Sequence, residues 1–118
     1  MRFMMMVKAD EQGAPPPALM EAMGKLIERE TRAGRLIDTG GLLPKPMGFE
    51  VRLHGGKVKV VDGPFAEAKE VIGGYAIFEL AGREEAEASA IEFMTLHKDF
   101  APGWEGICEV RAMAPTGG

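Results

Sequence analysis

The sequence of 118 residues contains a single cysteine, Cys108, and only 7% aromatic residues. One cysteine cannot form an internal disulfide, which excludes a disulfide scaffold and suits a reducing compartment. The apolar run at residues 3–7 is too short for a signal peptide or a membrane span. We therefore expect a cytoplasmic protein with no membrane partner.

Basic residues show no clustered excess. The chain has 14 Lys and Arg against 18 Asp and Glu, for a net charge of -4. Proteins that bind nucleic acids usually carry a clustered positive patch. The charge balance predicts no nucleic-acid partner.

Histidine is scarce, and His54 and His97 are the only two. No His/Cys/Asp cluster has metal-ligand spacing. A Ser-His-Asp or Cys-His arrangement cannot be assembled, and the Gly-Gly pairs lack a phosphate-loop context. We therefore expect no metal and no cofactor. Cys108 is predicted to face the core and to be inert.

The patterned segments fit one domain over residues 1–118. Amphipathic periodicity predicts helices at residues 18–33 and 83–96. Apolar runs and alternation predict strands at residues 3–7, 36–39, 49–54, 57–61, 73–80 and 107–113. Two strand–helix–strand units in one sheet indicate an α+β ferredoxin-like sandwich, with an antiparallel sheet, both helices on one face and an added hairpin.

The hairpin is predicted around Gly55-Gly56, because a primed turn needs positive φ at both central residues. This turn sets Leu53 opposite Val58 on one face. On the other face it opposes like charges, so that face should be solvated.

Apolar side chains fall on both faces of the expected sheet, since Phe78 and Leu80 point opposite to Ile77. Two helices can cover only one face. A second apolar face suggests a partner, most simply another copy of the chain in a two-fold homodimer.

Alternation also places ionisable residues on that second face. If Cys108 and Val110 face the helices, the second face carries Tyr75, Glu79, Glu109 and Arg111. Between two sheets, burial and pairing would shift their pKa values. A structural ion-pair network and a functional site both remain open interpretations.

Residues 62–75 read DGPFAEAKEVIGGY, and MRFMMMVKA, AMGKLIERETRAGRL, GGLLP and EVRAM occur elsewhere in the chain. Together these segments resemble the DGPF-type proteins of the YCII-related superfamily over most of the sequence. The resemblance implies a ferredoxin-like protomer and a dimeric α+β barrel.

The resemblance implies less about function. Some relatives look to be fused to, or paired with, extracytoplasmic-function sigma factors. In other branches a His–Asp pair has been proposed as catalytic, and one branch contributes to dehalogenation of aromatics. Here Ala18-Leu19-Met20 occupies the position of that histidine, GGLL stands where relatives often carry GEGL, and Ala68 replaces a common Thr. These departures argue against an acid–base enzyme of that type.

Two residues of the DGPF segment are candidate contacts. Asp62 matches the family Asp at a strand end, where it would either contact a ligand or cap the turn. Lys69 would pair with Asp62, bind an anionic ligand or remain solvated between Glu67 and Glu70.

Three hypotheses follow. The first is a small organic ligand in the cleft between two sheets, with Asp62, Lys69 and Arg111 as polar contacts. The second is an interaction or regulatory module for a sigma factor or another protein. The third is a weak acid–base enzyme that uses Asp62 with Tyr75 or Glu79. Whether the protein is an enzyme stays open.

Overall fold

The structure, a computed structural model, describes residues 1–10, 14–43, 48–62 and 71–115. Within these ranges, six strands and two helices follow one another in the predicted order. They are β1 (Arg2–Ala9), α1 (Pro17–Arg32), β2 (Leu36–Gly41), β3 (Phe49–His54), β4 (Lys57–Asp62), β5 (Val71–Glu79), α2 (Arg83–Phe100) and β6 (Ile107–Ala112). Neither helix is long and apolar enough, over the residues described, to cross a membrane.

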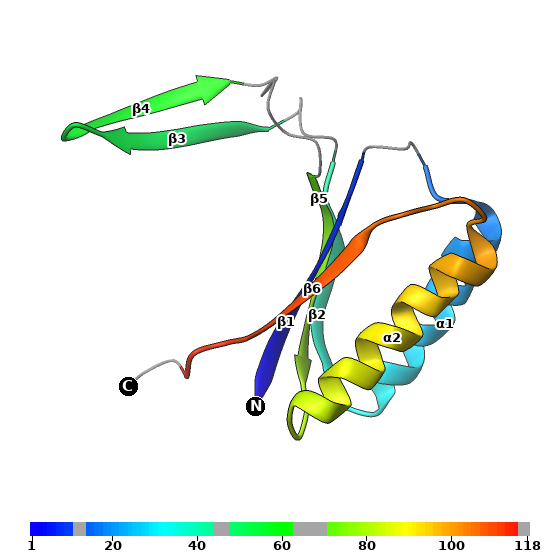
Figure 1. Cartoon of the computed structure of the whole chain (residues 1–118). Helices are drawn as coiled ribbons and strands as arrows, with labels where there is room; N and C mark the ends of the chain where they lie inside the picture. The colour runs from blue at the N-terminus through cyan, green and yellow to red at the C-terminus, as the bar shows by residue number, and fades with distance from the viewer. Residues whose placement is uncertain (11–13, 44–47, 63–70, 116–118) are drawn as a thin grey trace.

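Four strands form the main sheet in the order β2-β5-β1-β6. Every neighbouring pair is antiparallel. Both helices lie against the same face (Figure 1). This arrangement confirms the predicted α+β ferredoxin-like fold.

The strands β3 and β4 form a separate two-stranded sheet. Leu53 pairs with Val58 as predicted. Gly55 and Gly56 have φ of 57° and 77°, the left-handed region in which glycine is not strained. The hairpin and its primed turn are therefore confirmed.

The core lies between the helices and the sheet. It uses alternate residues of the strands, because successive side chains of a strand point to opposite faces. The buried cluster consists of Phe3, Met5, Leu36, Phe78, Leu80 and Ala86.

Two details of the helices differ from the prediction. Helix α2 runs to Phe100, beyond the predicted end at residue 96, because His97 continues its buried stripe. The helix then stops just before Pro102, since the residue preceding a proline disfavours helical φ/ψ. In α1, Leu19 is buried, but Met20 and Ile27 are 54% and 41% exposed, so the buried stripe is narrower than predicted.

A buried carboxylate joins the end of α1 to the start of β2. Glu30 is only 4% exposed. Its Oε1 accepts a hydrogen bond from Arg35 Nε at 3.0 Å, and its Oε2 accepts one from Arg29 Nε at 3.2 Å. Hydrogen bonding to Arg35 is the main reason that the pKa of Glu30 lies below its ordinary value.

We expect Glu30→Gln to lower the free energy of unfolding by about 2 kcal/mol at pH 7, a typical effect of losing hydrogen bonds to a charged group. The folded pKa of Glu30 is lowered from 4.5. Its contribution is therefore complete above that value and is lost as pH falls through the lower folded pKa. Urea unfolding of the parent and the variant at neutral and acidic pH measures this difference.

The matched control is Glu28→Gln, since Glu28 pairs with Arg32 at the exposed surface of the same helix. Exposed pairs contribute little to stability. Equal losses in the two variants, or a loss for Glu30→Gln that does not shrink in acid, would contradict this role of Glu30.

Candidate functional site on the open sheet face

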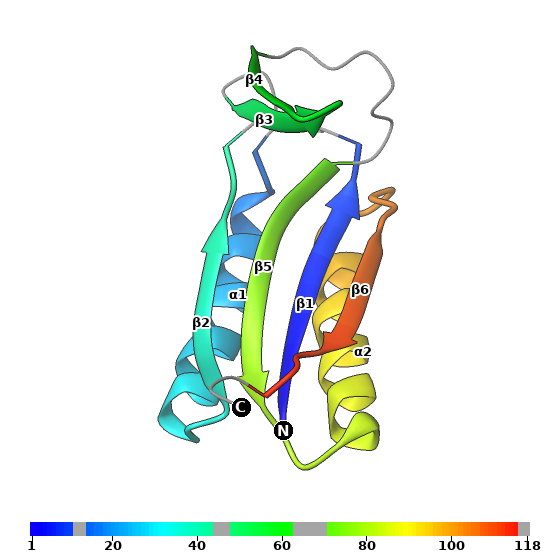
Figure 2. The ribbon, with the colours of Figure 1, turned by 90° about the vertical axis from the view of Figure 1, so that its left-hand side faces the viewer.

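The face of the main sheet that turns away from the helices is here called the open face, and neither described helix covers it (Figure 2). Its centre is apolar. Met4 pairs with Ile77, and Met6 pairs with Tyr75. All four side chains are half-buried in the single chain. Met4, Met6 and Ile77 form the floor of the candidate site, and Tyr75 lies at its edge.

One side of the floor is bounded by β6. Glu109 pairs with Met6 and Arg111 pairs with Met4, which places both charges on the open face. Glu109 Oε1 accepts a hydrogen bond from Lys8 Nζ at 2.8 Å, and Arg111 Nε lies 4.0 Å from Glu109 Oε2. The bond to Lys8 is the main cause that lowers the pKa of Glu109. Glu109 is thus held as a carboxylate near neutral pH.

The other side of the floor is bounded by a Tyr–Asp pair. The Tyr75 hydroxyl donates to Asp38 Oδ2 at 3.0 Å, and Thr39 Oγ1 donates to the Tyr75 carbonyl at 2.8 Å. The bond to Asp38 is the main cause that raises the pKa of Tyr75. A Cβ at Gly40 would lie 3.1 Å from the Tyr75 ring, so glycine leaves room for this ring position.

Asp38 was not a sequence candidate, and the reason is a β-bulge. Strict alternation would place it on the same side as the buried Leu36. The register shifts between these two residues, so Leu36 pairs with Phe78 and Asp38 with Ile77 on the open face. Bulges re-aim side chains in this way. Lys8 was missed too, although its alternation with Met6 was visible in the sequence.

Glu79 lies away from the Tyr–Asp pair. Its carboxylate accepts a hydrogen bond from the amino group of Met1, and Arg2 Nε lies 3.4 Å from its Oε1. The bond to the N-terminus is the main cause that lowers the pKa of Glu79. Within one chain, Tyr75, Glu79 and Glu109 thus each have a different partner, and Met6 lies between Tyr75 and Glu109.

Asp62 of the DGPF segment stands apart from this floor, in the separate sheet of β3 and β4. Asp62 is exposed as the last residue of β4, opposite Phe49. Lys69 lies outside the described residues, as does the rest of segment 63–70.

The two histidines and the cysteine lie in different surroundings. His97 is 6% exposed and packs between Phe93 and Trp104, with ring centroids at 4.6 and 4.4 Å. His54 is exposed. Burial raises the pKa of the Cys108 thiol, which opposes formation of a reactive thiolate. In the part of the chain that the structure describes, no three His, Cys, Asp or Glu residues are placed to hold a metal.

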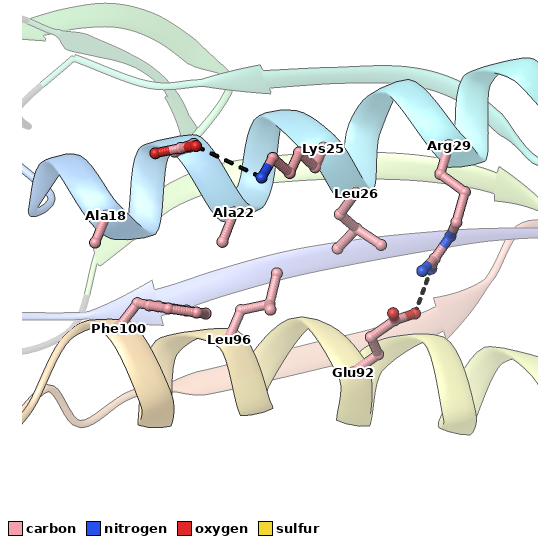
Figure 3. A pocket seen from close by; sticks show the side chains of 9 residues that line it. Ala18, Ala22, Lys25, Leu26, Arg29, Glu92, Leu96 and Phe100 are labelled. Atoms are coloured by element: carbon pink, nitrogen blue, oxygen red, sulfur yellow. Dashed lines mark hydrogen bonds and ion pairs between the residues drawn. The ribbon is translucent and has the colours of Figure 1, made fainter.

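A groove lies between α1 and α2, on the side of the sheet away from the open face (Figure 3). This interhelical groove has a volume of about 480 Å³. Its apolar lining consists of Ala18, Ala22, Leu26, Leu96 and Phe100. Charged pairs stand along it, with Lys25 Nζ 3.5 Å from Glu21 Oε1 and Arg29 Nη2 2.5 Å from Glu92 Oε1.

Comparison with known families gives a match between residues 1–94 and the YCII-related domain. The matched range extends from β1 into α2 and includes the DGPF segment. No curated protein matches the chain.

Tyr75 is the only tyrosine of the chain, so phenolate absorbance reports on it alone. We expect it to ionise above the ordinary pKa of 10.0, because ionisation breaks the bond to Asp38 and places two negative charges side by side. Asp38→Asn removes the charge and should return the titration towards 10.0. Ultraviolet titration measures the shift.

Asp99→Asn is the control, since Asp99 is an exposed residue at the end of α2. It should leave the tyrosine titration unchanged. A parent protein that titrates at the value of the Asp38→Asn variant would show that the Tyr–Asp pair is absent in solution.

Proposed function

The chain belongs to the YCII-related family, and from this premise we propose that it is a homodimer that binds a small organic molecule between two open faces. The observation that carries this proposal is the composition of the open face. A half-buried apolar floor lies between the Tyr75–Asp38 pair and the Lys8–Glu109–Arg111 group. An apolar surface with a few oriented polar groups is the usual make-up of a ligand site.

The surface area of the chain supports a partner. It exposes 8556 Å² for a mass of 12.7 kDa. A compact monomer of this mass exposes roughly 6,200 Å². The radius of gyration is 16.2 Å, against roughly 13.5 Å for a compact domain of this length. A stable interface buries roughly 800 Å² per partner, which this excess accommodates.

The polar groups favour an anionic ligand with an apolar body. Arg111 is the most accessible cation of its group, with a side chain 73% exposed beside Glu109. The hydroxyl of Tyr75 already donates to Asp38, which leaves its oxygen to accept a hydrogen bond from a donor, such as a hydroxyl, elsewhere on the ligand. Enclosure between two sheets would lower the local dielectric and strengthen both contacts. Asp62 and Lys69 of the DGPF segment are further candidate contacts.

The titration behaviour of the open face supports binding over acid–base catalysis. The pKa is lowered for Glu79 and Glu109 and raised for Tyr75. An efficient general acid or base has a pKa near the working pH. All three shifts move the pKa of the group further from neutral pH.

A thermal-shift screen against small organic carboxylates tests the proposed ligand class. A ligand that binds only the native state raises the melting temperature. We expect Arg111→Gln to weaken binding of such a hit roughly tenfold or more, since a charge-assisted hydrogen bond is lost. Titration calorimetry on the hit measures the affinity.

Arg83→Gln is the matched control, because Arg83 is an exposed cation at the start of α2 with a side chain 91% exposed. It should leave the affinity unchanged. If Arg111→Gln and the parent bound the hit with equal affinity, Arg111 would not be a contact of the ligand. The proposed function would be contradicted if the screen gave no hits and the protein sedimented as a monomer.

The interhelical groove favours a second candidate function, an interaction module for a protein such as an extracytoplasmic-function sigma factor. The groove lies on the side away from the open face and would stay accessible in a dimer. Ala18, Ala22 and Leu26 supply one apolar wall at helical spacing, which suits an amphipathic partner helix.

We expect Ala22→Arg to abolish calorimetric binding of a purified sigma factor of this class, because a long charged side chain would fill the groove. Arg111→Gln should leave that binding intact, which separates the groove from the open face. Binding that survives Ala22→Arg would exclude the groove as the contact surface.

A further inference from the structure

The hairpin of β3 and β4 has an apolar face that the other described elements of the chain leave exposed. The five side chains of this face are 57–73% exposed, and they are Phe49, Val51, Leu53, Val58 and Val60. Cross-strand pairing of Val51 with Val60 and of Leu53 with Val58 aligns them on one side. Among the described residues, no other element packs extensively against the hairpin. An isolated two-stranded hairpin is only marginally stable in water.

The position of the hairpin indicates what covers this face. The hairpin projects from one end of the main sheet, away from the helices and towards the side of the open face (Figure 1). Seen from the open face, it stands beyond the ends of β2 and β5 (Figure 2). A second copy that covers the open face therefore also lies next to the hairpin.

We propose that the hairpin is an arm whose apolar face is buried against a second copy of this chain. The proposal rests on the homodimer proposed above and names a segment that each copy contributes to the other. Asp62, the last residue of the arm, would then be brought towards the space between the two sheets.

The surface area that a stable dimer buries supports a second copy of the chain as the partner that covers this apolar face. Exposed apolar patches on monomers rarely exceed a few hundred Å², and five such side chains reach that order. A stable interface buries roughly 800 Å² per partner. The arm and the open face lie on one side of the chain, so both can contribute to a single interface with one partner copy (Figure 1).

Charge adds a second argument. The tip of the arm carries Lys57, Lys59 and Arg52, of which Arg52 pairs with Glu50 at 2.8 Å, whereas the whole chain has a net charge of -4. The rest of the molecule is therefore acidic. The tip of one arm is attracted to the body of another copy, which favours their encounter.

Site-specific photocrosslinking tests the arm in the full chain. We place p-benzoylphenylalanine at Leu53, on the apolar face, or at the adjacent His54, on the solvated face. Sedimentation velocity of the parent reports the oligomeric state. We expect a dimeric parent and a covalent dimer after illumination with the probe at Leu53, with at least fivefold less product from His54.

A second pair of variants tests the contribution of the arm to affinity. Leu53→Asn should raise the dimer dissociation constant at least tenfold, while His54→Asn should change it less than twofold. Both substitutions lie beside the turn of the same exposed hairpin, so a failure to fold is not expected from either.

The outcomes separate the two proposals. A dimeric parent with no crosslinked dimer from Leu53, or with equal effects of the two Asn variants, overturns the arm and leaves the proposed dimer standing. A parent that is monomeric at all concentrations overturns both. A crosslink that forms only within one chain also overturns the arm.

Discussion

Two helices cover only one face of a four-stranded sheet, and this constraint governs the rest of the structure. The covered face holds the buried core of Phe3, Met5 and Phe78. The same strands place Met4 and Ile77 on the open face, where they remain only half-buried. A sheet that is apolar on both sides is typical of an interface or a ligand site, because monomers rarely leave large apolar surfaces in water. The proposed dimer, the ligand site and the role of the arm all depend on a partner that covers this face.

Polar groups on the open face are held in position by their neighbours. Asp38 orients the hydroxyl of Tyr75, and Lys8 holds Glu109 as a carboxylate. Glu79, in contrast, secures the N-terminus through Met1. The same face therefore combines structural ion pairs with groups that stay accessible, of which Arg111 is the clearest. These local pairs account for the directions of the pKa shifts of Tyr75, Glu79 and Glu109.

The sequence was sufficient to predict on which face of the sheet the candidate site lies. Alternation along β5 and β6 correctly assigned Tyr75, Glu109 and Arg111 to the side away from the helices, because strand periodicity is independent of neighbours. The partners of these residues were not predictable. Asp38 reaches Tyr75 only because a bulge shifts the pairing of β2 with β5. A bulge depends on how two strands distant in sequence fit together, and single-strand patterns do not record that fit.

By itself, the sequence determined the kinds and order of the elements, the ferredoxin-like fold and the register of the hairpin. These follow from apolar periodicity and from turn residues such as Gly55-Gly56, which act locally. Tertiary structure decided that α2 extends past His97, which packs between Phe93 and Trp104. It also decided that the hairpin stands clear of the main sheet, with its apolar face exposed in the single chain. Packing between distant segments sets these features, since burial depends on which surfaces meet.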